Sequence, residues 1–184
     1  MPPSFWTDPL MYQGGSDSFV GCNDEIEMAD EAWGIDFEGE IGVVVGATLR
    51  HATDAEARRA IRGLVAANDV SARDWQKNDG QWARAKGCDT FLPLGPEAPA
   101  PADLDGVTVV TRHNGVERQR AKASDMVFPI PMLLAYVSRY ITLEAGDLLL
   151  TGTPAGVHPI APGDTVEIEL VCLSKVSSPV RAGR

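Results

Sequence analysis

The chain has 184 residues, 44% apolar and 23% charged, which is typical of one globular domain with a substantial core. No apolar run approaches the roughly 20 residues of a membrane span, and the N-terminus lacks the pattern of a secretory signal. A formal net charge of −10 argues against a nucleic-acid-binding protein, because such a protein needs a basic surface. Three widely spaced cysteines indicate reduced thiols and a cytoplasmic location.

Residues 1–33 are rich in Gly, Pro and Asp, and predict an irregular segment of loops with one short strand. A strand is expected next, from Ile35 to Gly46. Because side chains alternate along a strand, one set should pack on the core: Phe37, Ile41, Val43 and Val45. The other set, Glu38, Glu40, Gly42 and Val44, should share the opposite face.

A helix is predicted to begin after Thr53 and to end near Asn68. Thr53 and Glu56 fit a capping box, in which each side chain accepts a hydrogen bond from a backbone N–H of the first turn. Apolar residues follow at helical spacing: Ala57, Ala60, Ile61, Leu64 and Val65. The arginines off this stripe, Arg58, Arg59 and Arg62, should face solvent.

The rest of the chain alternates between loops and short elements. Residues 69–87 predict an ordered loop with short helical turns. Asn114-Gly115 is a strong signal for a hairpin joining strands at 107–112 and 116–120. Further elements are expected as a helix at 131–140 with Pro131 in its first turn, strands at 147–151 and 165–171, and a loose tail at 174–184. Because strands and helices do not alternate regularly, the fold class is α+β, mainly β.

Three carboxylates form a candidate metal site. Glu38 and Glu40 lie two residues apart on the predicted strand, so their side chains project to the same side. Like charges held this close repel each other unless a cation joins them or one is protonated. With Asp69, they offer oxygen ligands that suit Mg²⁺, Mn²⁺ or Ca²⁺. The competing interpretation is a solvated face of a strand, which is the commoner origin of a lone Glu-x-Glu.

Polar residues with complementary charge follow Asp69. Arg73 and Gln76 lie in the same short stretch, and Lys86 comes soon after it. Arg pairs bidentately with carboxylates, and Lys supplies a compact charge. From these residues alone, ordinary surface ion pairs of Arg73 and Lys86 with nearby acids are the preferred interpretation. Cys88 is interpreted as a packed thiol, because no His lies near it in sequence to activate it. Trp75 and Trp82 are interpreted as packing residues, and the turn 151–156 lacks the ending of a phosphate-binding loop.

Several of these motifs occur in the order seen in the fumarylacetoacetate hydrolase family, which the chain resembles from about Trp33 to Val180. They are Asp36 to Glu40, Asn68 to Gln76, Lys86 to Pro96, Leu149 to Val157 and Gly163 to Glu169. The resemblance implies a mixed β-roll and a homodimer. It divides the chain into an irregular segment (1–33), a catalytic domain (34–180) and a tail (181–184).

The resemblance also implies roles for individual residues. One divalent metal ion would be bound by Glu38, Glu40 and Asp69. Substrate would be bound by Arg73, Gln76 and Thr153, with Lys86 as the catalytic cation. Many members carry a His-x-x-Glu pair upstream of the metal motif, and none of His51, His113 and His158 precedes Glu38. The expectation is a truncated reading frame or a natural variant, which places hydrolysis in more doubt than metal binding.

The function expected from this pattern is action on a small anionic 2-oxo acid. Chelation by the metal would polarise the 2-oxo group and stabilise an enolate, a step that serves C–C bond hydrolysis, decarboxylation and isomerisation alike. Such reactions occur in the breakdown of aromatic compounds and 2-oxo acids. The alternative is a catalytically impaired family member that binds a metabolite or a partner subunit.

Overall fold

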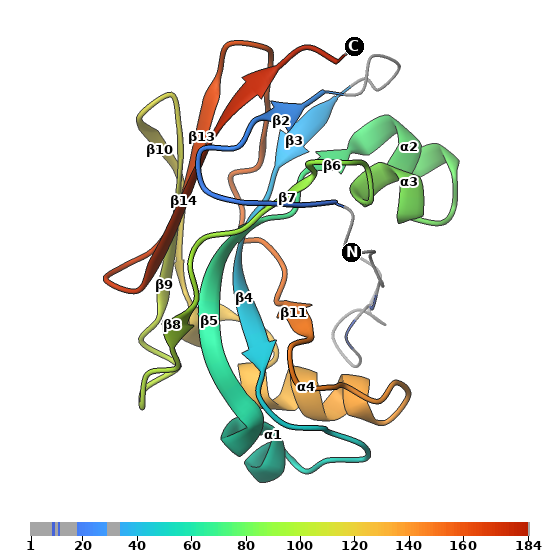
Figure 1. Ribbon diagram of the computed structural model, residues 1–184, viewed down its shortest axis with the longest axis vertical. Helices are drawn as coiled ribbons and strands as arrows, with labels where there is room; N and C mark the ends of the chain where they lie inside the picture. The colour runs from blue at the N-terminus through green and yellow to red at the C-terminus, as the bar shows by residue number, and fades with distance from the viewer. Residues whose placement is uncertain (1–8, 10, 12–17, 29–33, 184) are drawn as a thin grey trace.

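Strands dominate the computed structural model, which describes Pro9, Met11 and residues 18–28 and 34–183. Two sheets form most of it (Figure 1), one with strand order β10-β9-β13-β14-β2 and one with order β11-β4-β5-β8. Their strands are β2 (Ile26–Glu27), β4 (Gly39–Val45), β5 (Ile61–Asn68), β8 (Ala98–Pro99), β9 (Thr108–His113), β10 (Val116–Lys122), β11 (Leu148–Leu150), β13 (Thr165–Leu170) and β14 (Ser174–Arg181). The expected α+β fold, mainly β, is confirmed.

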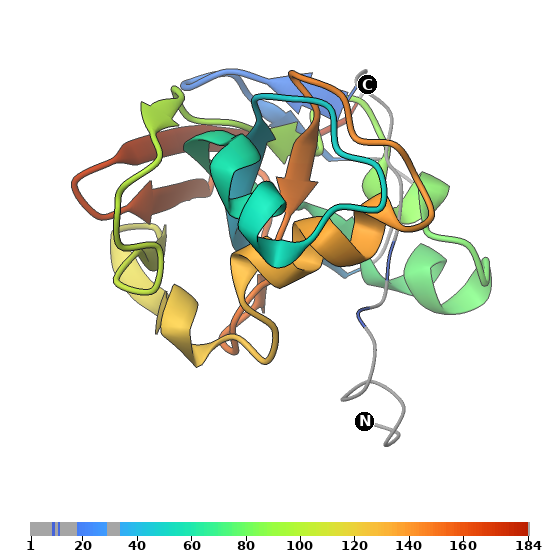
Figure 2. The ribbon, with the colours of Figure 1, turned by 90° about the horizontal axis from the view of Figure 1, so that it is seen from below.

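Smaller elements complete the fold. A sheet of order β12-β3-β6 joins His158–Pro159, Ile35–Phe37 and Ser71–Ala72, and β1 (Phe19–Val20) pairs in parallel with β7 (Leu92–Pro93). Helices α1 (Asp54–Ala60) and α4 (Ile130–Ser138) pack together across one end of the molecule (Figure 2), with a 3-10 turn, η3 (Ala123–Asp125), before α4. Helices α2 (Arg73–Asn78) and α3 (Ala83–Lys86) pack on each other beside β6.

The first predicted strand is buried on both faces. The core set is nearly inaccessible, with Phe37, Ile41, Val43 and Val45 no more than 3% exposed, as the alternation predicted. The opposite face is also buried, including both glutamates. The interpretation of Glu38 and Glu40 as a solvated face is therefore wrong, because other parts of the chain cover that face.

One predicted strand is in fact two. Instead of running from Ile35 to Gly46, the chain breaks at Glu38 into β3 and β4, which belong to different sheets. At the break, backbone N–H groups bond to side chains: Glu38 N donates to Asn68 Oδ1 at 3.0 Å and Gly39 N donates to Gln119 Oε1 at 3.1 Å. The sequence gives no local signal for these partners, because both lie far along the chain.

The long helix predicted from Thr53 to Asn68 is wrong in its second half. The capping box of Thr53 and Glu56 is present, but α1 ends at Ala60 and Ile61–Asn68 forms β5. This strand lies between β4 and β8 and is buried on both faces except at Arg62, so its apolar residues run on without alternation. Such a run cannot be distinguished from a buried helix by spacing alone. The Arg prediction holds for Arg59 and Arg62, whereas Arg58 is half-buried and donates to two backbone carbonyls.

The loose tail predicted at 174–184 is also wrong over most of its length. Ser174–Arg181 forms β14, which pairs with β13 over residues 174–179 and with β2 at Val180 and Arg181. Its buried residues alternate along the strand: Ser174, Val176, Ser178 and Val180. Because small polar residues hold two of these inward positions, the period-two pattern is hard to see in the sequence.

The other predicted elements are confirmed within a few residues. Asn114 and Gly115 both have positive φ, at 52° and 77°, as the expected tight hairpin between β9 and β10 requires. Helix α4 and strands β11 and β13 lie where they were expected, and the 69–87 stretch holds the short helices α2 and α3. The segment 1–33 differs from the prediction of loops with one short strand, because residues 18–28 contain two, β1 and β2; much of the rest lies outside the described residues.

Candidate metal centre

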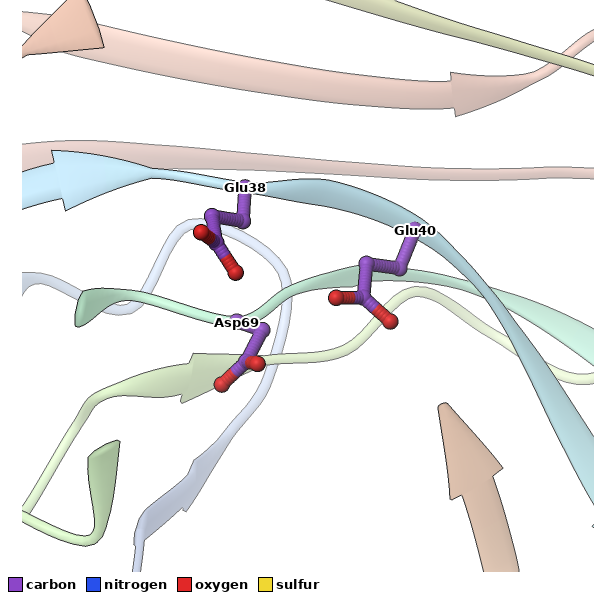
Figure 3. Close-up of side chains that lie close together, drawn as sticks. All are labelled: Glu38, Glu40 and Asp69. Atoms are coloured by element: carbon purple, nitrogen blue, oxygen red, sulfur yellow. The ribbon is translucent and has the colours of Figure 1, made fainter. Parts of the chain in front are cut away.

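Three acidic side chains meet where β4 and β5 lie side by side. The two strands are antiparallel, with Gly39 opposite Asn68, so the end of β5 delivers Asp69 to the break at Glu38. Asp69 N donates to Glu38 O at 2.9 Å and fixes this approach. Figure 3 shows Glu38, at the break before β4, and Glu40, on β4, projecting from the same side of the chain towards Asp69. One oxygen of each carboxylate lies within 4.8 Å of the others, which is close enough for all three to contact one cation.

Burial gives these carboxylates unusual electrostatics. The pKa of Glu40 lies well above its ordinary value, because burial disfavours its charged form and Asp69 and Glu38 repel it. The pKa of Asp69 is also raised, mainly by burial, although Lys86 partly offsets this. A hydrogen bond from Gly152 N to Glu40 Oε2, at 2.6 Å, is the backbone contact that favours the charged form of Glu40.

Lys86 points into this cluster rather than to solvent. Its side chain is only 6% exposed, and Nζ donates to Glu38 Oε2 at 3.0 Å, to Ser71 Oγ at 2.8 Å and to Asp69 Oδ2. Burial alone would lower the pKa of Lys86, but the attraction of Asp69 and Glu38 outweighs it and the pKa is raised. Lys86 is therefore a fixed cation at neutral pH. Its burial contradicts the interpretation as a surface lysine and agrees with the buried position that the family resemblance implied.

Arg73 forms the second cationic contact. Its Nε donates to Asp36 Oδ2 at 2.7 Å, another nitrogen bonds Glu38 Oε1, and Nη1 donates to Gln76 Oε1 at 3.0 Å. Arg73 and Gln76 are thus brought together beside the carboxylates. The side chain of Arg73 is 21% exposed, so it lies at the edge of the cluster rather than on the open surface.

The loop after β11 closes the site from another direction. Gly152 binds Glu40, and the neighbouring Thr153 donates its hydroxyl to Gly39 O at 3.0 Å. Thr153 therefore lies beside the backbone that links Glu38 to Glu40. All seven residues that the sequence singled out for metal or substrate are gathered in one region: Glu38, Glu40, Asp69, Arg73, Gln76, Lys86 and Thr153.

Sequence reasoning missed several residues that build this region. Asp36 pairs with Arg73, Ser71 binds Lys86, and the amide of Gln119 reaches both Gly39 and Thr153. Asp36 alternates with Glu38 and Glu40, so the Asp-x-Glu-x-Glu spacing could have identified it. Gln119 carries no such signal, because it lies in a hairpin about 80 residues along the chain from Gly39.

The donor set fits a hard divalent cation. Four carboxylates (Asp36, Glu38, Glu40 and Asp69) and two cations (Arg73 and Lys86) leave a formal charge of −2, which one divalent ion would balance. Oxygen-only ligands favour Mg²⁺, Mn²⁺ or Ca²⁺ over zinc. Within the part of the chain that the structure describes, no other group of three potential ligands comes together in this way.

Residues 1–181 match the model of the fumarylacetoacetate hydrolase C-terminal domain. The chain belongs to the fumarylacetoacetate hydrolase family. The solved structure of a 5-carboxymethyl-2-hydroxymuconate delta-isomerase from Mycobacterium smegmatis has a TM-score of 0.93 and is 40% identical, covering 96% of this chain and 70% of its own. The resemblance inferred from the motifs is thereby confirmed.

Two curated relatives are named for different reactions of small acids. A 2,4-didehydro-3-deoxy-L-rhamnonate hydrolase from Sphingomonas is 41% identical over 155 residues, which cover 82% of this chain and 54% of the relative. A mitochondrial oxaloacetate tautomerase from Xenopus laevis is 35% identical over 185 residues, covering 94% and 58%. The chain thus spans a little more than half of these relatives, and family members include a hydrolase, an isomerase and a tautomerase.

Residues next to the site have packing roles. Trp75 packs against the core, and the guanidinium of Arg84 lies 4.5 Å from the centre of its ring; Trp82 is half-buried. Cys88 also packs against the core, and burial raises the pKa of its thiol, which disfavours the reactive thiolate. These features agree with the interpretation of Cys88 as a packed thiol.

Among the described residues, no helix has the length and apolar character needed to span a bilayer.

Proposed function

We propose that this chain is a divalent-metal-dependent enzyme that acts on small anionic 2-oxo acids through an enolate. The observation that carries the proposal is the buried cluster of Glu38, Glu40 and Asp69 with Lys86 in contact. Buried like charges are costly unless a cation joins them, so the fold maintains an arrangement that ordinary stability would not favour. A functional site is the reason to keep it.

Glu38, Glu40 and Asp69 would hold the ion, with Mg²⁺ as the first candidate. A divalent ion bound there supplies Lewis-acid polarisation of the 2-oxo group and lowers the energy of the enolate. Lys86 contributes a permanent positive charge, because its raised pKa keeps the ammonium protonated and makes it a poor general base. Its role is to attract the anionic substrate and stabilise negative charge as it develops.

Arg73, Gln76 and the Thr153 loop would orient the substrate. Arg73 lies at the exposed edge of the cluster, where a substrate carboxylate can reach its guanidinium. The hydroxyl of Thr153 already donates its only proton to Gly39 O. The group that this residue offers an anion is therefore its backbone N–H, for which no acceptor is found within residues 18–28 and 34–183.

The enolate step serves all the reactions named for the relatives. Tautomerisation of oxaloacetate moves a proton between C3 and the 2-oxo oxygen through the enolate of oxaloacetate. Decarboxylation breaks the C3–C4 bond, releases carbon dioxide and leaves the enolate of pyruvate. Hydrolysis adds water at a distal carbonyl and breaks the adjacent C–C bond, with an enolate as the leaving group. We take oxaloacetate as the first substrate to test, because it reports both tautomerisation and decarboxylation. Breakdown of aromatic compounds is the proposed setting, by analogy with the muconate isomerase.

The test is an assay of the purified chain with oxaloacetate and an acylpyruvate, with and without Mg²⁺ or Mn²⁺. Enol loss is followed by ultraviolet absorbance, and pyruvate is measured by a coupled enzyme. We expect turnover that requires the metal, that chelation abolishes and that Glu40→Gln removes. A matched control is Glu117→Gln, which changes an exposed glutamate paired with Arg120. Turnover that survives both chelation and Glu40→Gln would contradict the proposal.

The alternative is a catalytically impaired member that binds a metabolite or a partner subunit. The same preparation distinguishes the two. Calorimetry with Mg²⁺ and oxalate, a non-reactive analogue of the 2-oxo acid group, reports binding without chemistry. Binding of oxalate without turnover of any of the acids would favour the impaired form.

A further inference from the structure

Gln119 is a buried amide in an otherwise exposed strand. It is only 1% exposed, whereas its neighbours on β10, Arg118 and Arg120, are exposed. The pairing of β10 with β9 slips between Glu117 and Gln119, an irregularity of the β-bulge type. Such bulges turn a side chain away from the regular alternation. At this register shift, a long polar side chain is directed into the interior. Burying an amide there costs free energy unless it is hydrogen-bonded, whereas an apolar residue would not carry this cost.

Every polar atom of this amide has a partner in the proposed site. Oε1 accepts from Gly39 N at 3.1 Å, and Nε2 donates to Thr153 Oγ1 and to Pro154 O, each at 2.8 Å. Because Thr153 Oγ1 also donates to Gly39 O, the three residues form a closed ring of hydrogen bonds. Gly39 is the residue between Glu38 and Glu40. The ring of hydrogen bonds therefore connects the start of β4, which carries Glu40, to the loop that contains Thr153.

Two close backbone approaches leave this amide little freedom. A Cβ added at Gly39 would lie 2.0 Å from Thr111 Oγ1 on β9 and 3.0 Å from Gln119 Oε1, and one added at Gly156 would lie 2.2 Å from Arg118 O and 3.1 Å from Gln119 Cγ. Gly156 also has φ of +108°, a conformation that L side chains rarely adopt. The strand on one side and the loop on the other are thus packed directly onto β10 at Gln119.

We propose that Gln119 is a positioning residue that sets the place of the Thr153 loop relative to the Glu38–Glu40 pair. This inference rests on the proposed function, because it takes Thr153 to contact the substrate and the glutamates to bind the metal. The carboxylates themselves are held by the ladder between β4 and β5, which does not involve Gln119. Loss of the amide should therefore loosen the substrate side of the site and leave the metal side in place.

The first measurement is steady-state kinetics of Gln119→Met, which keeps the length of the side chain and removes its hydrogen bonds. We expect KM for oxaloacetate to rise by roughly tenfold, kcat to fall much less, and the Kd for Mg²⁺ to stay within about twofold of the parent. Gln119→Glu should raise KM similarly, because it keeps the acceptor for Gly39 N but replaces the donor facing Thr153. A matched control is Arg120→Met, a change at the neighbouring exposed position of β10, where the side chain pairs with Glu117.

A double-mutant cycle tests whether Gln119 acts through Thr153. If it does, Thr153→Val combined with Gln119→Met should raise KM by clearly less than the product of the two single effects, because both changes break the same hydrogen bond between Gln119 Nε2 and Thr153 Oγ1. Additive effects, an unchanged KM, or a Mg²⁺ affinity that falls as much as KM rises would overturn the inference. So would failure of both Gln119 variants to fold, because the amide would then be required for folding itself. A parent that neither binds Mg²⁺ nor turns over any of the acids overturns the proposed function, and the inference with it.

Discussion

Glu40 is the residue whose surroundings are least favourable without a cation. It is 3% exposed, faces two other carboxylates and accepts a backbone hydrogen bond from Gly152. Neither Lys86 nor Arg73 makes a direct ion pair with it, in contrast to Glu38. Because the pKa of Glu40 is raised in the folded chain, ionisation of this carboxyl makes the folded state less stable. The loss of stability is complete above the raised pKa, shrinks as the pH falls below it, and is absent below the ordinary carboxyl pKa.

Glu40→Gln should therefore stabilise the metal-free protein while abolishing its response to metal. A glutamine oxygen can still accept from Gly152 N, but the charge is gone. We expect the free energy of unfolding of the metal-free protein to rise at neutral pH, measured by urea denaturation, by more than the roughly 0.5 kcal/mol of an ordinary surface substitution. Glu117→Gln, an exposed change, should stay within about 0.5 kcal/mol of the parent. A less stable Glu40→Gln variant would mean that the ionised carboxylate is well accommodated without a cation.

A change at Lys86 is expected to affect metal binding and turnover differently. Lys86 contacts Glu38 and Asp69 directly. In the metal-free chain its ammonium therefore competes with a metal ion for the oxygens of these two carboxylates. Lys86→Met keeps much of the aliphatic stem and removes the charge. We expect the variant to fold, to bind Mg²⁺ at least as tightly as the parent by calorimetry, and to lose most of its turnover of oxaloacetate. Lys175→Met, which removes an exposed lysine paired with Glu167, is the matched control. Parental turnover by Lys86→Met would show that Arg73 alone supplies the required charge.

At the scale of elements, local chemistry was readable and long-range pairing was not. The capping box of α1 and the Asn114-Gly115 turn depend on neighbours in sequence, and both were predicted. The site motif could be located because its residues cluster around Glu38 to Glu40 and Asp69 to Lys86. The end of α1 at Ala60 could not, because β5 is a strand only by virtue of lying between β4 and β8. The same holds for Gln119, whose partners lie about 34 and 80 residues away.

Strand β14 offers a test of an element that the sequence concealed. Val176 and Val180 are 1% and 4% exposed and belong to the core, between the small polar residues that disguise the strand. Val176→Ala should lower the free energy of unfolding by about 1–2 kcal/mol, because two methyl groups leave a packed position. Lys175→Ala, at the exposed neighbouring position, should have little effect. Equal effects of the two changes would mean that this segment packs as loosely as the predicted tail.

At the scale of the whole molecule, the charge of −10 affects both assembly and ion binding. Pairing of two copies stays a prediction from the family resemblance, and self-repulsion opposes it at low salt. We expect light scattering at micromolar concentration and physiological ionic strength to give the mass of a dimer. A mass equal to that of a single 19.7 kDa chain under these conditions would contradict the prediction.

A divalent cation should also stabilise this acidic molecule. The way in which the stability rises distinguishes binding at a specific metal site from general screening of the net charge. Binding to the folded state alone stabilises by about 2.7 kcal/mol at a ligand concentration one hundred times the Kd. For a chain of this size that corresponds to a rise of roughly 5–10 °C in Tm. The rise should saturate with Mg²⁺, and Glu40→Gln should remove it. Screening of the net charge predicts a different result. NaCl at matched ionic strength would then raise Tm as much as Mg²⁺ does, and the rise would be the same in Glu40→Gln as in the parent. Differential scanning calorimetry of the parent and of Glu40→Gln with both salts decides between site binding and screening. If NaCl raised Tm as much as Mg²⁺ does, the main support for a metal held by Glu38, Glu40 and Asp69 would be removed.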